Sequence, residues 1–154
     1  YGQRGFNAVT LAKAGLAAEL ARSFYAATAR GGFEDRCMGM CRFIVVGETD
    51  REAEALAGRA YPVWHQSFFE LFYRYGQKPV STTWAPNFAE MQASGLAFAG
   101  APATVAKALR AQLELVGANY LVGQFVFGDM SLAESLKSVT LFGERVMPEL
   151  VKAE

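Results

Sequence analysis

The sequence predicts an α/β protein built around a parallel β-sheet, and three observations lead to this expectation. Short apolar runs alternate along the chain with segments in which apolar residues recur every three or four positions, as on one face of a helix. Two of the helical segments begin with a capping box directly after an apolar run, and glycines follow the ends of two others. Strands that alternate with helices in this way are typical of a parallel sheet with right-handed crossovers.

Composition limits the kind of protein that this chain forms. Its 154 residues are 52% hydrophobic and 19% charged, with 15 basic and 15 acidic side chains, so we expect a single folded domain over residues 1–154. Without a basic cluster, nucleic acid is not expected as a partner. Without an uninterrupted apolar run of about 18 residues, neither is a membrane. We predict a cytoplasmic protein whose apolar excess covers a subunit interface as well as a core.

The first part of the chain contains two predicted strands and a helix between them. Residues 5–10 form a short apolar run, which we interpret as a strand. Residues 16–29 carry apolar side chains at helical spacing, and this helix should end at the glycines that follow it. Residues 37–46 form the second strand. Its last four residues are continuously apolar, as expected where both faces of a parallel sheet are covered.

A capping box predicts where the second helix starts. Thr49 is followed three residues later by Glu52, so the hydroxyl and the carboxylate can each satisfy a free backbone donor. The apolar pattern then continues to about Tyr75. Pro62 should kink or break this helix near residues 60–61, because proline removes a backbone donor and clashes with the preceding turn.

Residues 77–95 are predicted to be a long loop or insertion. They contain two prolines and a polar run without clean periodicity, and only residues 87–93 suggest a short helix. A brief apolar run at residues 96–99 follows. Pro102 then suits the first turn of a helix, where its missing donor costs nothing.

The last part of the chain contains the clearest predicted strand, residues 120–127. A second capping box, formed by Ser131 and Glu134, starts the final helix. Pro148 should stop or bend that helix.

Candidate ligand-binding residues follow from the direction of the strands. Ligands of parallel α/β proteins bind at the carboxyl ends of strands, which here are Thr10, Gly47 and the pair Gly128 and Asp129. The helices that begin after Gly47 and Gly128 offer free backbone N–H groups that can hold a phosphate. Asp129 is either a ligand contact or a solvated acid that interacts favourably with the dipole of the helix that follows it. The same two alternatives hold for Glu48, beside Gly47.

The other reactive side chains have mainly structural interpretations, and no short catalytic motif occurs. Gln124, in an otherwise apolar strand, must find hydrogen-bond partners if it is buried. It either lines a barrel interior or contacts a cofactor, and the structural interpretation is favoured. His65 lies among aromatic residues, which favours a structural role. Cys37 and Cys41, about 13 Å apart on one strand face, are beyond disulfide distance, so we expect free thiols and no metal site.

Four segments together resemble the C-terminal part of the bacterial luciferase-like, flavin-dependent monooxygenases. Residues 42–53 are similar to a strand followed by the family's Thr-Asp-x-Glu-Ala helix start. Residues 100–105 resemble its Gly-x-Pro-x-x-Val segment, and residues 117–120 its turn into the last strand. Residues 141–150 look like its closing helix, which ends in Val-Met-Pro.

This resemblance implies a (β/α)₈ barrel that binds reduced flavin, usually FMN, and in many members oxidises a substrate with molecular oxygen. A whole barrel takes about 250 residues. We therefore expect a partial barrel with parallel strands that holds the last three to four βα units. The resemblance implies cofactor-binding roles for Thr10, Gly47, Gly128 and Asp129. No catalytic residue can be carried over, because the family's N-terminal half, which usually holds the catalytic histidine, has no counterpart here.

Two functional alternatives follow. The chain, which begins at Tyr1 instead of Met, is either the C-terminal part of a full flavin-dependent monooxygenase or a stand-alone, non-catalytic half-barrel that oligomerises, with or without flavin binding. An open parallel sheet leaves strand edges and an apolar interior to be covered. We therefore expect a homo-oligomer or a missing N-terminal half as the partner.

Overall fold

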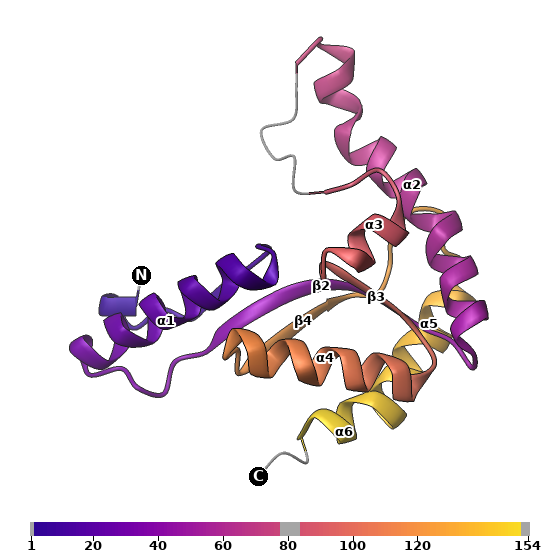
Figure 1. Ribbon diagram of the computed structural model, residues 1–154. Helices are drawn as coiled ribbons and strands as arrows, with labels where there is room; N and C mark the ends of the chain where they lie inside the picture. The colour runs from indigo at the N-terminus through magenta and orange to yellow at the C-terminus, as the bar shows by residue number, and fades with distance from the viewer. Residues whose placement is uncertain (1, 78–83, 152–154) are drawn as a thin grey trace.

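A computed structural model describes residues 2–77 and 84–151, and its fold confirms the predicted α/β class (Figure 1). The strands in these residues are all parallel and form a single four-stranded sheet. They are β1 (Ala8–Thr10), β2 (Met38–Val46), β3 (Ala97–Gly100) and β4 (Tyr120–Gln124).

Strand β2 lies at the centre of the sheet. On one side it pairs with β1 through residues 38–40 and with β3 through residues 43–46, and on the other side it pairs with β4 through residues 39–43. Two backbone hydrogen bonds show these opposite sides. The carbonyl of Cys37 accepts from the N–H of Ala8 next to β1, and the following carbonyl, of Met38, accepts from the N–H of Asn119 next to β4. The order β1–β2–β4 is therefore that of three neighbouring strands, with the short β3 added beside the carboxyl half of β2.

The outer face of the sheet is covered by α1 (Ala14–Gly31), α4 (Pro102–Val116) and α5 (Leu132–Leu141). Even-numbered side chains of β2 point to this face. They form one apolar core with these helices, whose members include Met40, Ile44, Phe24, Leu109 and Leu141. Helix α1 connects β1 to β2, and α4 connects β3 to β4. Both connections run in the same direction across the sheet, so right-handed crossovers place both helices on the same face.

Among the described residues, the inner face is covered only along the carboxyl half of β2. Phe43 and Val45 pack against α2 (Asp50–Arg74) and α3 (Phe88–Ala93), which lie above the strands in Figure 1, whereas α4 lies below them. The amino half of this face is open. Val9 and Tyr120, which flank Gly39 there, are 48% and 50% exposed.

A buried arginine connects the outer core to the sheet. Arg42 of β2 has no exposed surface; its Nε donates to Oε1 of Gln112 at 2.7 Å, and its Nη atoms donate to the carbonyls of Cys41 and Ala12. Gln112 in turn donates to the carbonyl of Gly95 at 2.8 Å. Burial lowers the pKa of Arg42 to about 10, while the neighbouring Cys41 thiol acts in the opposite direction.

Of the two predictions about prolines, the break at Pro62 is wrong, whereas the interruption of the final helix near Pro148 is confirmed. Helix α2 continues without a break through Pro62, where Tyr61 and Trp64 pack edge-on against Phe43 and hold the surrounding turns. The final helix changes before Pro148: α5 ends at Leu141, a π-helical turn covers Phe142–Val146, and α6 (Met147–Val151) contains the proline.

Other element ends differ from the predictions by a few residues. A 3₁₀ turn, Gly2–Arg4, precedes β1, and the positive φ of Gly5 shortens the first strand. Strand β4 ends at Gln124, so residues 125–127 leave the sheet. Within the predicted insertion, residues 78–83 lie outside the described residues, and the expected short helix is α3, which Asn87 caps. No described helix combines the length and apolarity that crossing a membrane requires.

Candidate functional site

A cavity with charged walls lies where the carboxyl end of β2 meets the first turns of α2 and α5. Its volume is about 370 Å³, within the usual range of small-molecule sites. We call it the charged cavity. Its lining includes Gly47, Glu52, Leu56, Arg59, Glu134 and Lys137.

Local capping interactions fix the entrance to α2 beside this cavity. Thr49 accepts a hydrogen bond from the backbone of Glu52 at 3.2 Å, which confirms the first half of the predicted capping box. Glu52 accepts from the backbone of Glu48 instead of from that of Thr49, so the second half is not formed. Asp50 accepts from the backbone N–H of Ala101, the N-cap residue of α4, at 2.7 Å, which lowers the pKa of Asp50. The starts of α2 and α4 are therefore held together.

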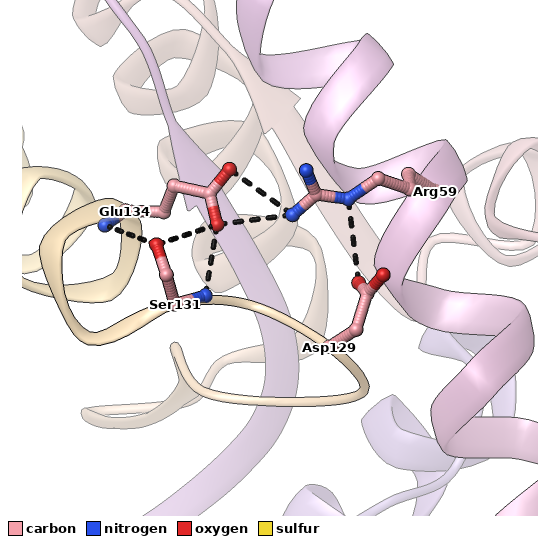
Figure 2. Close-up of polar contacts among 4 residues, drawn as sticks. All are labelled: Arg59, Asp129, Ser131 and Glu134. Carbon is pink, nitrogen blue, oxygen red and sulfur yellow. Dashed lines mark hydrogen bonds and ion pairs between the residues drawn. The ribbon is translucent and has the colours of Figure 1, made fainter.

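The start of α5 carries the second predicted capping box, which is confirmed. Ser131 accepts from the backbone of Glu134, and Glu134 accepts from the backbone and hydroxyl of Ser131 at 2.8 Å (Figure 2). The same carboxylate accepts from Arg59 through both oxygens at 3.0 Å. Arg59 first, and the Ser131 contacts next, lower the pKa of Glu134 to about 2.

A second ion pair lies on another wall of the charged cavity. Lys137 and Glu52 are 2.6 Å apart, which lowers the pKa of Glu52 and raises that of Lys137. Each of these side chains keeps about half of its surface exposed. The cavity thus contains two cations, Arg59 and Lys137, and each is paired with a carboxylate.

Three of the four predicted site residues come together around α2. Gly47 lines the charged cavity, and Asp129 accepts from Nε of Arg59 at 3.3 Å (Figure 2). Gly128 has a φ of 60° and lies so close to α2 that a β-carbon would overlap the carbonyl of Ala60. Thr10 lies elsewhere: β1 pairs only with residues 38–40, and the Thr10 hydroxyl accepts from the backbone of Ala12.

Sequence reasoning missed the two cations of the charged cavity. Arg59 follows Glu52 by seven positions and Lys137 follows Glu134 by three, so each lies on the same helix face as an acid of a predicted capping box. That spacing was the available signal that these cations lie near the capping acids. The contacts of Arg59 with Glu134 and of Lys137 with Glu52, however, join α2 to α5, so they depend on the tertiary structure and cannot be read from the spacing.

The remaining candidate side chains do not gather into a second reactive site. The His65 ring packs 4.6 Å from the ring of Phe69, as the aromatic setting predicts. Cys37 and Cys41 are free thiols, and burial raises the pKa of Cys41. In the part of the chain that the structure describes, no three metal-ligating side chains lie together.

Comparison with known proteins relates this geometry to one fold. No family model matches the chain. It is 34% identical over 110 residues to the uncharacterised protein y4wF of Sinorhizobium fredii, over 71% of this chain and 32% of that protein. Among solved structures, 96% of the chain superposes on 43% of the monooxygenase RslO1 from Streptomyces bottropensis, with a TM-score of 0.78 and 18% identity.

A second solved structure is similar at a comparable level. It is the oxygenating constituent of the 3,6-diketocamphane monooxygenase from Pseudomonas putida, in complex with FMN, with a TM-score of 0.74 and 16% identity. The match covers 97% of this chain and 44% of that one. The chain therefore has the fold of part of a TIM-type barrel, and it spans about a third of the length of the curated relative and about two-fifths of these monooxygenases.

Proposed function

We propose that this chain is the C-terminal part of a luciferase-like, flavin-dependent monooxygenase and that it binds FMN. The observation that carries the proposal is the charged cavity, which presents Arg59 and Lys137 at the carboxyl end of a central parallel strand. Parallel α/β proteins bind their ligands at this end. The FMN complex of a structural neighbour adds support.

The residues present fit the phosphate of FMN. Arg59 and Lys137 would supply cationic donors in exchange for Glu134 and Glu52, and Gly47 leaves the strand end without a side chain. Asp129 would orient Arg59. Gly128 would keep its loop against α2, and Thr10 would contact another part of the flavin. Bound flavin would supply the electron transfer and oxygen chemistry, as cofactors do.

The open inner face supports the proposal of a covering partner. In the described residues β4 pairs only with β2, and Val9 and Tyr120 are half exposed on the inner face. An apolar groove of about 680 Å³ also lies between α4, β4 and α6. We propose that the missing N-terminal half of the barrel covers these surfaces, in a cytoplasmic protein whose two cysteines stay reduced.

The exposed inner face also favours the second candidate function, a non-catalytic half-barrel that covers this face with another copy of itself. Light scattering separates the two candidates. A homo-oligomer that binds no flavin supports the second, whereas a monomer that binds FMN rules it out.

Binding of FMN to the full chain tests the proposed function. Fluorescence titration should give saturable binding in the micromolar range. Arg59→Met should weaken FMN binding by about tenfold or more, because it removes a charge-assisted hydrogen bond to the phosphate. Arg74→Met is the matched control, since Arg74 lies at the far end of the same helix and pairs with Glu70. If both variants bind FMN like the wild type, the charged cavity is not the phosphate site.

A further inference from the structure

Gln124 is the last residue of β4 and belongs to the inner face of the sheet. It pairs in register with Phe43, as Val122 pairs with Cys41. Directly paired residues of parallel strands point to the same face. The alternating residues Leu121 and Gly123 pair with Met40 and Arg42 of the outer face, and Leu121 packs in the outer core.

The surroundings of Gln124 on this face are apolar. Its nearest strand neighbours there are Phe43 and Val122, and the ring of Phe127, just beyond the strand, packs 5.2 Å from that of Phe43. The Gln124 side chain is half-buried, yet no described residue hydrogen-bonds to its carboxamide. A carboxamide can donate two hydrogen bonds and accept two more.

Gln112 shows how this chain treats a glutamine that has a structural role. Its Oε1 accepts from Arg42 at 2.7 Å and its Nε2 donates to Gly95 at 2.8 Å, so both ends of the amide are used inside the protein. Gln124 has neither contact. The carboxamide of Gln124 reaches accessible surface on a largely apolar face and has no partner among the described residues, so it is available to a ligand.

We propose that the carboxamide of Gln124 binds a planar ligand that carries adjacent N–H and C=O groups on one edge. One amide end accepts from the ligand N–H and the other donates to its carbonyl. The ring contacts the open part of the inner face next to Gln124, where Cys41 and Val122 are only partly buried. This inference rests on the proposed function, within which the ligand is the pyrimidine edge of the flavin ring. Gln124 is then a flavin-positioning residue, distinct from the phosphate contacts in the charged cavity.

Titration with two flavins tests this inference on the full chain. Lumiflavin carries the ring alone, whereas FMN carries the ring and the phosphate. Gln124→Leu should weaken binding of both flavins by about tenfold, as the loss of one or two hydrogen bonds does. Gln66→Leu, on the exposed surface of α2, is the matched control and should bind both flavins like the wild type. The side-chain amide resonances of Gln124 should shift when lumiflavin is added.

The outcomes separate this inference from the function on which it rests. If Gln124→Leu binds both flavins like the wild type, the inference is wrong while flavin binding stands. If the wild type binds neither flavin, both are wrong. Thermal unfolding excludes a merely structural role: without a protein partner to lose, Gln124→Leu should keep or raise the melting temperature. A clear fall in that temperature would overturn the inference.

Discussion

Arg59 of α2 donates to both carboxylate oxygens of Glu134 of α5 at 3.0 Å and so joins two helices that begin at the carboxyl ends of β2 and β4. The two residues are 75 positions apart in the chain. Each is positioned by its own helix, Glu134 through the capping box with Ser131 and Arg59 through the contact with Asp129. The charged cavity therefore has one wall made by an ion pair that spans two βα units.

The stability of this connection should depend on pH. The pKa of Glu134 is about 2 in the folded chain, against an ordinary value of 4.5, because hydrogen bonds from Arg59 and Ser131 stabilise the charged carboxylate. Its contribution is fully present above the unfolded value and is lost as the pH falls from about 4.5 towards 2. The melting temperature of the wild type should therefore fall more steeply over this range than that of Glu134→Gln. Parallel falls in the two proteins would contradict the ion-pair assignment.

Gly128 should be essential for the contact between its loop and α2. It has a φ of 60°, and an added β-carbon would overlap the carbonyl of Ala60. Gly128→Ala should lower the free energy of unfolding by about 2–4 kcal/mol, from backbone strain and overpacking together. Gly58→Ala, at an open position of α2, should instead raise it by about 0.5–1 kcal/mol. Urea unfolding of both variants measures the difference, and equal effects would refute the close approach.

Arg42 and Gln112 should behave as one unit. Replacing Gln112 with Leu removes the acceptor of a buried guanidinium, and replacing Arg42 with Met leaves Gln112 and two carbonyls without their donor. Each single change should cost about 1.5–3 kcal/mol of unfolding free energy. The double variant should cost less than the sum, because neither partner is then left unpaired. Additive costs in the double-mutant cycle would show that the pair is not coupled.

Tyr61 carries a buried hydroxyl that has no hydrogen-bond partner in the described structure. Burial raises the pKa of this phenol, so it stays protonated. Tyr61→Phe keeps the ring contacts with Phe43 and Phe127 and removes only the unpaired oxygen, so it should leave stability unchanged or raise it by up to about 1 kcal/mol. Tyr61→Ala should cost about 3–5 kcal/mol by creating a cavity. Thermal unfolding that shows a marked loss in Tyr61→Phe would reveal a missed partner.

Features that depend on neighbouring residues could be predicted from the sequence. The capping box of Ser131 and Glu134 is confirmed, since its donors and acceptors lie within one turn. So is the short helix expected at residues 87–93, which is α3. The extent of β2 is also close to the prediction, because a continuously apolar run between turn signals leaves few alternatives.

Features that depend on tertiary packing could not be predicted. The burial of Arg42 is not visible in a strand sequence, because it requires Gln112 from a helix 70 positions away. The uninterrupted course of α2 through Pro62 depends on packing of the adjacent turns against Phe43. For the site, strand ends indicated Gly47 and Asp129, but the role of Arg59 depends on a contact between α2 and α5.

Fluorescence titration of the wild-type chain with FMN tests the central proposal most directly. Binding to a partial barrel with a phosphate site should quench or enhance flavin emission along a saturable curve in the micromolar range, and inorganic phosphate should compete with FMN at the charged cavity. An emission that follows the added FMN linearly, with no saturation and no effect of phosphate, would contradict the proposal that this chain is part of a flavin enzyme.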